Sequence, residues 1–309
     1  MIPMSSDRYT LGVDVGGTHL RLGLTTQDGD FIAYEKHATA ALDDTPTESL
    51  FTLISDYICR NGAKKRVAAV CIGFPATVDK KRETVLNAPN VHGLDGIPVG
   101  RILSERLGIP VFIERDVNLL LLNDQKRMGI TARDVIACYV GTGLGNAILL
   151  NGELFLGNSG VAGELGHVPF GDVVTPCGCG NVGCAEGLVA GRYLAELAKG
   201  PLAPTPVSEL FAVHGKSRLL QEYIERLARV IAAEVNILDP GVLLLGGGVI
   251  NMTAFPRKTL ETAIRAHTRK PLPNDALQIL YAEDADGRGG AIGAGILAWR
   301  YVKNEDSHR

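Results

Sequence analysis

Short apolar runs alternate with amphipathic stretches along most of the chain. Residues 67–73 form a continuous apolar run of strand length, which is typical of a strand covered on both faces. Residues 217–238 form the clearest helix, because their large apolar side chains recur every three or four positions. Such an alternation of strands and helices predicts an α/β fold. The other predicted strands are 9–14, 20–25, 31–37, 111–114, 135–140, 146–150 and 242–245, and the other predicted helices are 45–61, 116–128 and 288–301.

One local pattern occurs twice in the chain. A predicted strand at 9–14 is followed by a glycine turn and a second strand at 20–25, and the same order of strand, glycine turn and strand occurs again at 135–150. This repetition predicts a duplicated fold built from two similar halves.

Composition narrows the class of protein. The chain has 309 residues, enough for two domains with a sizeable core. Its 31 Lys and Arg residues against 34 Asp and Glu residues give a formal charge of −3, which predicts no attraction to nucleic acid. No apolar stretch approaches the ~18–20 residues of a membrane-spanning helix, and the first ten residues lack the segments of a secretory signal. We therefore expect a cytoplasmic protein that binds neither nucleic acid nor membrane.

Three glycine-rich turns, at 14–18, 141–145 and 246–248, each follow a predicted strand. Glycine permits a positive φ and lets backbone N–H groups approach an anion. Any one of them could be a plain hairpin turn, and none matches the Walker or dinucleotide-binding pattern. The three together predict a nucleotide clamp, in which Asp14 orients a hydrated Mg²⁺ and Thr18 donates a hydroxyl. The candidate ATP-binding residues are Asp14, Gly16, Gly17, Thr18, Gly141, Thr142, Gly143, Gly246, Gly247 and Gly248.

Three of the six cysteines crowd into eight residues, while Cys71 and Cys138 lie in apolar strand-like runs and are expected in the core. The crowded set is Cys177, Cys179 and Cys184, with His167 ten residues upstream. Three thiolates and one imidazole suit a closed, tetrahedral and therefore structural Zn²⁺ site. Two alternatives to a zinc site remain. One is a disulfide, which a cytoplasmic location disfavours, and the other is a set of buried cysteines without metal.

Four motifs resemble those of the ROK family (repressors, open reading frames, kinases), and their order and spacing fit over essentially the whole chain. They are Asp-Val-Gly-Gly-Thr at 14–18, Glu-Arg-Asp-Val-Asn at 114–118, Gly-Glu-Leu-Gly-His at 163–167 and Cys-Gly-Cys-Gly-Asn-Val-Gly-Cys-Ala-Glu at 177–186. The resemblance implies an actin-like (RNase H-like) duplicated ATPase fold, with two lobes and an interlobe cleft for ATP and sugar. We expect a small lobe at 1–117 completed by a C-terminal helix at 289–309, and a large lobe at 118–288 that carries the zinc.

The resemblance also implies ATP-dependent transfer of the γ-phosphate to the 6-hydroxyl of a hexose, and a homodimer. By motif position, Asp116 is the catalytic base, which takes the proton of the attacking hydroxyl. Asp116 follows a predicted strand and opens a predicted helix, so an ordinary N-cap is the alternative. His167 could bind zinc through one ring nitrogen and a sugar hydroxyl through the other. The candidate sugar-binding residues are Asn90, Arg115, Asp116, Glu164, His167 and Glu186.

Two departures from the family pattern lie next to the predicted sugar site. Arg115 stands where family kinases usually have asparagine, and residues 91–94 replace a Leu-Pro-Gly-Trp type sequence. Asparagine donates and accepts hydrogen bonds, whereas arginine only donates, so ordinary glucokinase specificity is in doubt. Residues 73–76, 115–119 and 254–257 are most similar to family kinases that act on D-allose, which makes D-allose the predicted acceptor.

Several alternatives stay open at this point. Other hexose acceptors are glucose, fructose, mannose and N-acetylmannosamine. A sugar-responsive repressor would need a helix-turn-helix domain before the first glycine turn, and that turn already begins at Asp14. A sugar-binding regulator without catalysis is the third alternative, against which the retained Asp116 and the glycine turns argue.

Overall fold

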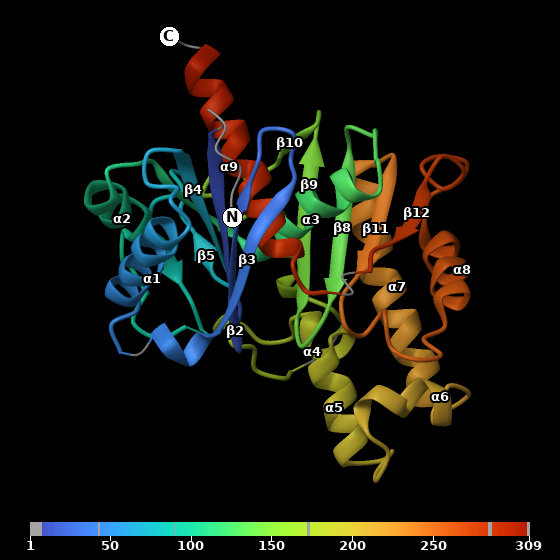
Figure 1. Cartoon of the computed structure of the whole chain (residues 1–309). Coiled ribbons are helices and arrows are strands. Elements are labelled where there is room, and N and C mark those ends of the chain that lie inside the picture. The colour runs from blue at the N-terminus through green and yellow to red at the C-terminus, as the bar shows by residue number, and fades with distance from the viewer. Residues whose placement is uncertain (1–7, 43, 90, 172–173, 284–285, 308–309) are drawn as a thin grey trace. The chain divides into compact units, whose positions relative to one another are not determined.

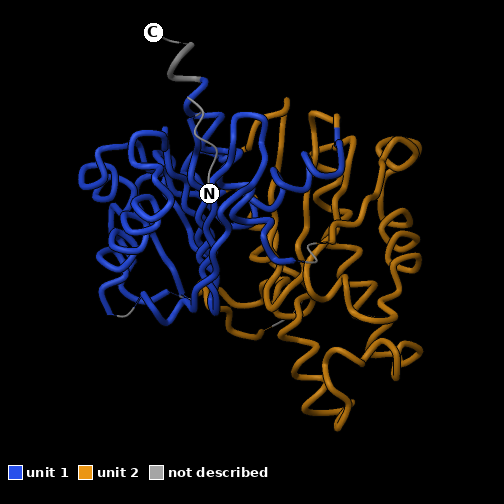
Figure 2. The backbone as a smooth tube through the Cα atoms, viewed as in Figure 1, with its two compact units in different colours: residues 1–130, 156–161, 285–309 blue, residues 131–155, 162–284 orange. Residues whose placement is uncertain are grey.

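A computed structural model describes residues 8–42, 44–89, 91–171, 174–283 and 286–307. The chain divides into two compact units (Figure 2). Unit 1 comprises residues 1–130, 156–161 and 285–309, and unit 2 comprises residues 131–155 and 162–284. The expected boundary at 117/118 falls inside helix α3 (Asp116–Arg127), and the whole helix belongs to unit 1, where it packs against helix α9 (Gly289–Ser307).

Unit 1 is built on a five-stranded sheet with the order β3-β2-β1-β4-β7 (Figure 1). Strand β1 is antiparallel to β2 and parallel to β4, and β4 is parallel to β7. The strands are β1 (Tyr9–Val15), β2 (His19–Thr25), β3 (Phe31–Ala38), β4 (Val67–Phe74) and β7 (Val111–Arg115). The remaining elements are η1 (Thr39–Leu42), α1 (Pro46–Arg60), β5 (Thr77–Val78), β6 (Val85–Asn87) and α2 (Val99–Leu107), besides α3 and α9.

The period-2 alternation of β1 decides what covers each face of its sheet. Its odd-numbered residues are large and apolar and join the core that also contains the buried side chains of α1 and α2. Its even-numbered residues face α9: the Thr10 hydroxyl donates to the Gly295 carbonyl at 2.8 Å, and Gly12 lies where a Cβ would overlap the backbone of α9. The small residues of α9 therefore let the helix lie directly on β1.

Unit 2 repeats this topology with the order β10-β9-β8-β11-β12. An antiparallel hairpin, β8 with β9, is followed by two strands parallel to β8. The strands are β8 (Val135–Val140), β9 (Leu144–Leu150), β10 (Glu153–Leu154), β11 (Val242–Gly246) and β12 (Gln278–Tyr281). The helices are η2 (Leu165–His167), α4 (Glu186–Val189), α5 (Gly191–Lys199), η3 (Val207–Glu209), α6 (Leu210–His214), α7 (Arg218–Leu238) and α8 (Arg257–His267). The common strand order agrees with the predicted duplication.

All the strands and helices predicted from sequence are present, with ends that differ by one or two residues at most positions. Ser217 caps α7 by accepting a hydrogen bond from the Leu220 N–H at 3.4 Å. Cys71 and Cys138 are fully buried, as expected. Within the described part of the chain, no helix is both long enough and apolar enough to cross a membrane.

Candidate functional site

In unit 1, the first glycine turn and the Asp116 motif lie at the same edge of the sheet. The parallel strands β1, β4 and β7 end together, and their register places Asp14 beside Gly73 and Gly73 beside Glu114. Two strand spacings separate the backbones of Asp14 and Glu114 by about 10 Å. Asp14 and Asp116 are therefore brought to one edge by the sheet itself.

Asp14 packs against the first turn of α9. A Cβ at Gly290 would lie 2.5 Å from the carboxyl carbon of Asp14, so only glycine leaves room for this contact. The partial positive charge of a helix N-terminus favours a carboxylate there, and the Arg21 guanidinium lies 3.5 Å from Asp14 Oδ2. In the following turn, the Thr39 hydroxyl donates to the Gly16 carbonyl at 2.6 Å. The turn that holds Gly16, Gly17 and Thr18 is thus tied to the end of β3.

Asp116 is the first residue of α3, and its Oδ1 accepts a hydrogen bond from the Val117 N–H at 2.8 Å. The N-cap position belongs to Arg115, whose side chain makes no capping hydrogen bond. The alternative interpretation of Asp116 as the N-cap is therefore wrong. Arg115, a predicted sugar-binding residue, is only 6% exposed.

Glu114 fixes the junction between β7 and α3 from inside the unit. Its Oε1 accepts hydrogen bonds from the Arg115 N–H and from Asn118 Nδ2, both at 2.8 Å, and its Oε2 lies 3.2 Å from Arg82 Nε. Burial raises the pKa of Glu114, and the Arg82 guanidinium opposes that rise. Arg82 was not predicted as part of this site, because nothing in the local sequence links it to the Asp116 motif.

In unit 2, the second and third glycine turns line one pocket of about 770 Å³. The Gly191 N–H donates to the Gly141 carbonyl at 2.8 Å and the Arg192 N–H to the Thr142 carbonyl at 3.1 Å, so the start of α5 holds the second turn. Gly248 lines the same pocket, whereas Gly246 is a buried strand residue. The polar residues of the pocket that were not predicted from the sequence are Arg192, Ser208, Asn251 and Thr253.

The glycines of these turns serve mainly as positions without a side chain. Among them only Gly247 has a positive φ, of 93°, and a Cβ there would lie 2.5 Å from the Val140 carbonyl oxygen. The other glycines of these turns do not use the positive φ that glycine permits. At Gly17, Gly141 and Gly248 a Cβ would meet no atom within 4 Å, so the backbone beside them is open to a ligand.

Glu186 binds the second glycine turn. Its Oε2 accepts a hydrogen bond from the Leu144 N–H at 2.9 Å, and its Oε1 lies 2.7 Å from Arg192 Nη2. The Glu186 side chain is 12% exposed. The structure thus places this predicted sugar-binding residue against Arg192 and the turn.

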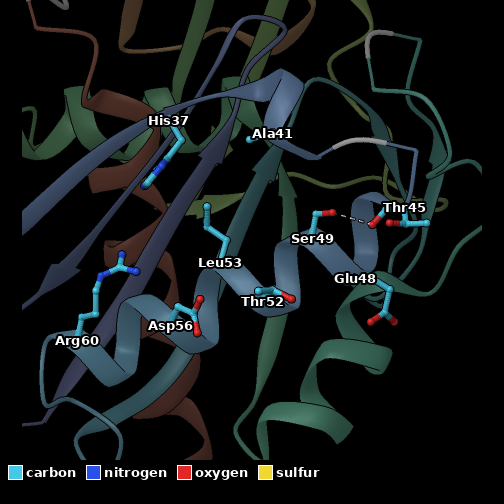
Figure 3. A pocket seen from close by; sticks show the side chains of 9 residues that line it. All are labelled: His37, Ala41, Thr45, Glu48, Ser49, Thr52, Leu53, Asp56 and Arg60. Atoms are coloured by element: carbon cyan, nitrogen blue, oxygen red, sulfur yellow. Dashed lines mark hydrogen bonds between the residues drawn. The ribbon is translucent and has the colours of Figure 1, made fainter.

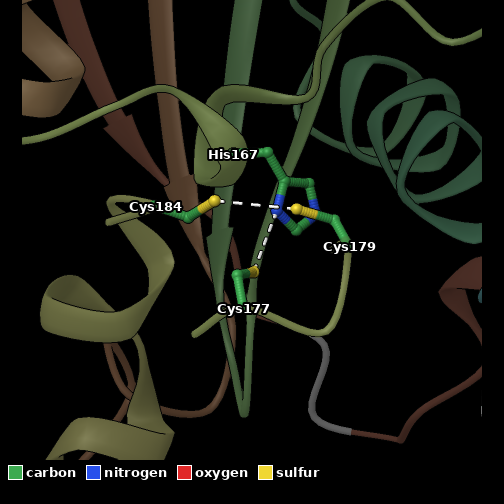
Figure 4. Close-up of side chains that lie close together, drawn as sticks. All are labelled: His167, Cys177, Cys179 and Cys184. Carbon is green, nitrogen blue, oxygen red and sulfur yellow. Dashed lines mark hydrogen bonds between the residues drawn. The ribbon is translucent and has the colours of Figure 1, made fainter. Parts of the chain in front are cut away.

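The four predicted metal ligands lie together in unit 2 (Figure 4). Their ligand atoms all lie within 4.8 Å of one another; the Cys179 and Cys184 Sγ atoms are 3.6 Å apart, and Cys177 Sγ is 3.5 Å from His167 Nδ1. In a tetrahedral zinc site, S–Zn–S and S–Zn–N edges are about 3.8 and about 3.6 Å. The donor set and its spacing therefore fit a four-coordinate metal ion.

The two nitrogens of His167 face different groups. Nδ1 faces Cys177, and Nε2 lies 3.6 Å from Glu164 Oε2. Glu164 and His167 therefore form one polar pair beside the cysteine cluster. Burial, followed by the two neighbouring thiols, raises the pKa of Cys184 to about 12. A bound metal ion would favour the thiolate.

A separate hollow of about 480 Å³ lies along α1 in unit 1 (Figure 3). Its charged lining residues are Glu48, Asp56 and Arg60. His37 also lines it, and both His37 and Arg60 contact Glu35, at 3.1 and 2.9 Å. The hollow contains none of the predicted site residues that the structure describes. Asn90, one of the predicted sugar-binding residues, lies outside the described residues.

Comparison with known proteins finds relatives along most of the chain. A sequence model of the ROK family matches residues 10–300. The chain is 30% identical over 247 residues to the N-acetylmannosamine kinase of Escherichia coli O6:H1, covering 78% of this chain and 83% of that protein. The crystal structure of a ROK hexokinase from Thermus thermophilus is similar with a TM-score of 0.81 and 28% identity, covering 96% of this chain and 99% of the other.

A second solved structure is informative about ligands. It is a ROK family glucokinase from Streptomyces griseus in complex with glucose and AMPPNP, with a TM-score of 0.73, 29% identity, and coverage of 94% of this chain and 99% of the other. The chain therefore belongs to the ROK family. Its fold is the actin-like ATPase fold of that family, as predicted.

Proposed function

We propose that the protein transfers the γ-phosphate of ATP to the 6-hydroxyl of a hexose, with D-allose as the best candidate acceptor. The protein is a sugar kinase, like the relatives it matches along most of their length. The observation that carries the proposal is the placement of Asp14 and Asp116 at one edge of the unit 1 sheet. A metal-binding carboxylate and a base are the two acidic groups that phosphoryl transfer needs.

Asp116 acts as the base in this proposal. A sugar hydroxyl is a weak nucleophile, and a positioned carboxylate removes its proton as the bond to phosphorus forms. The Glu114 hydrogen bonds at the start of α3 hold the Asp116 backbone in place. Asp14 would hold Mg²⁺, which supplies positive charge to the phosphates of ATP.

The nucleotide is proposed to occupy the pocket of unit 2. Open backbone at Gly141 and Gly248 lets N–H groups approach phosphate oxygens without a side chain between them. The Streptomyces griseus relative, which was crystallised with AMPPNP and glucose, supports a nucleotide and a hexose as the two ligands. The remaining proposed nucleotide contacts are Gly16, Gly17, Thr18, Thr142, Gly143, Gly246 and Gly247.

The proposed sugar contacts are Asn90, Arg115, Glu164, His167 and Glu186, together with Asp116. Carboxylates accept hydrogen bonds, which suits a neutral polyol. We propose that the ion held by His167 and the three cysteines is Zn²⁺, in a structural site. The metal would fix the His167 ring, so that Nε2 and Glu164 keep their mutual orientation toward a sugar.

D-Allose is proposed over other hexoses because of Arg115. The side chain that replaces the usual asparagine can only donate hydrogen bonds, so it selects a different pattern of hydroxyl groups. Glucose, fructose, mannose and N-acetylmannosamine are the alternative acceptors, and N-acetylmannosamine is the substrate named for one relative. We also propose that the protein forms a homodimer and that it does not bind nucleic acid.

The test is a coupled ADP-release assay with Mg-ATP on these five sugars, followed by NMR assignment of the phosphorylated carbon. We expect D-allose to give the highest kcat/KM by an order of magnitude or more, with phosphate on carbon 6. A higher kcat/KM for another hexose would refute the proposed specificity for D-allose but not the proposed hexose kinase activity. ADP release no faster than without sugar, for all five, would refute the proposed hexose kinase activity.

A further inference from the structure

Arg192 touches three parts of unit 2 at once. Its backbone N–H donates to the Thr142 carbonyl at 3.1 Å, and its Nη2 lies 2.7 Å from Glu186 Oε1. Its side chain also lines the pocket that Gly141 and Gly248 share. The Arg192 side chain is nevertheless 45% exposed, so its contact with Glu186 does not enclose it.

The pocket offers one cation to an anionic ligand. Among the described residues that line it, Arg192 alone is charged, and the others are glycines and small, polar or apolar residues. No hydrogen-bond partner of the Thr142 and Gly143 N–H groups is found in the described part of the chain. Successive N–H groups of this kind form a concavity that binds anions. The pocket is therefore suited to phosphate, with a guanidinium beside the N–H groups.

Glu186 and a bound polyphosphate would compete for the same guanidinium. In the structure, one Glu186 oxygen accepts a hydrogen bond from the Leu144 N–H and the other contacts Arg192, so both are engaged. An arginine can form charge-assisted bonds to a carboxylate or to a phosphate, and a polyphosphate carries more negative charge. Movement of Arg192 toward phosphate would leave one Glu186 oxygen open to another donor.

We propose that Arg192 couples the two ligands: the phosphates of a nucleotide draw its guanidinium from Glu186, and the released carboxylate then accepts a sugar hydroxyl. This inference rests on the proposed function for the identity of the ligands. Because coupling of binding free energies is reciprocal, a sugar bound to Glu186 makes Arg192 available to the nucleotide by the same factor. Arg192 is thus a residue that strengthens the binding of each substrate when the other is present.

The experiment measures binding rather than turnover. The dissociation constants of Mg-AMPPNP and of D-allose, or of the best acceptor from the sugar panel, are determined by calorimetry, each with and without the other ligand. The variants are Arg192→Met, which keeps the aliphatic stem without the charge, and Arg192→Lys. Arg218→Met is the matched control, because Arg218 also lies 2.7 Å from a glutamate, Glu222, but is 91% exposed and outside the pocket.

For the wild type and Arg218→Met, we expect each ligand to tighten the other by about 5-fold or more, within the usual range of such couplings. For Arg192→Met, we expect weaker AMPPNP binding by about 10-fold, a coupling factor near 1, and sugar binding without nucleotide at least as tight as in the wild type. Arg192→Lys should keep part of the coupling. Full coupling in Arg192→Met would overturn the proposed role of Arg192 and leave the proposed function intact. The absence of coupling in a wild type that phosphorylates a hexose would do the same. A wild type that binds neither ligand would overturn this role and the proposed function together.

Discussion

Glu234 is a buried acid that the proposed chemistry does not use, and its replacement by glutamine should stabilise the protein at neutral pH. The side chain projects from α7 and is 7% exposed. Its Oε2 accepts a hydrogen bond from Asn146 Nδ2 at 2.9 Å and lies 3.9 Å from the Cys138 thiol. No cation pairs with it among the residues that the structure describes. Burial raises the pKa of Glu234 to about 7, and the bonds from Asn146 and Cys138 only partly oppose that rise.

The size of the effect follows from the two protonation equilibria. Below pH 4.5, the ordinary pKa of the group, the carboxyl is protonated in the folded and unfolded states alike, and its contribution does not change with pH. Between pH 4.5 and about 7 the unfolded chain loses the proton first, so the free energy of unfolding falls as the pH rises. At about 1.36 kcal/mol for each pH unit, the total loss is about 3 kcal/mol.

The assay is urea-induced unfolding of the wild type and Glu234→Gln between pH 4.5 and 8. Glutamine has nearly the same shape and does not ionise, so the variant lacks this loss. We expect its advantage in unfolding free energy to grow by about 2–3 kcal/mol from the acidic to the basic end. Glu196→Gln, at an exposed position of α5, is the control and should show no such growth. A difference between wild type and Glu234→Gln that is independent of pH would refute the reasoning.

Three further changes test other parts of the structure. Gly293→Ala should cost about 3 kcal/mol or more in unfolding free energy, because its Cβ would overlap the Leu119 carbonyl where α9 crosses α3; a loss below about 1 kcal/mol would contradict this packing. Gly290→Ala should lower kcat about 10-fold while the thermal midpoint changes little, since the new methyl group displaces the Asp14 carboxylate; unchanged kcat at limiting Mg²⁺ would argue against a metal at Asp14. Treatment with a chelator under reducing conditions, which would remove the proposed zinc ion, should lower the thermal midpoint and raise KM for the sugar. Full stability and activity in protein shown by mass spectrometry to contain no metal would contradict the structural site.

The features predicted correctly are those that neighbouring residues encode. The turn at 14–18, the β8–β9 hairpin and the cysteine cluster each lie within a short segment, so spacing alone revealed them. Helix α7 was found because its 21 residues give many turns of a regular apolar stripe. Helices α2 and α5 have 9 residues each, too few for a helical period to be separated from a loop, and both were missed.

The features not predicted depend on contacts between distant segments. Gly290 meets Asp14 only because α9 returns to β1 at the end of the chain. Arg82 reaches Glu114 through a buried ion pair, and no local motif announces it. Glu186 was assigned to a sugar by its motif position, whereas its observed partners, Arg192 and Leu144, come from α5 and β9. Side-chain partners of this kind follow from the tertiary fold and not from spacing.

The central claim, that Asp116 is the base of a hexose kinase, is tested most directly by Asp116→Asn. The variant keeps the size of the side chain and an oxygen that can accept from the Val117 N–H, so its thermal midpoint and its affinity for the sugar should stay near those of the wild type. Its kcat for ADP release should fall by about 10²–10⁴-fold. Asp56→Asn, an exposed acid on α1, is the control and should keep full activity. An Asp116→Asn protein that retains kcat within a few-fold of the wild type would contradict the account.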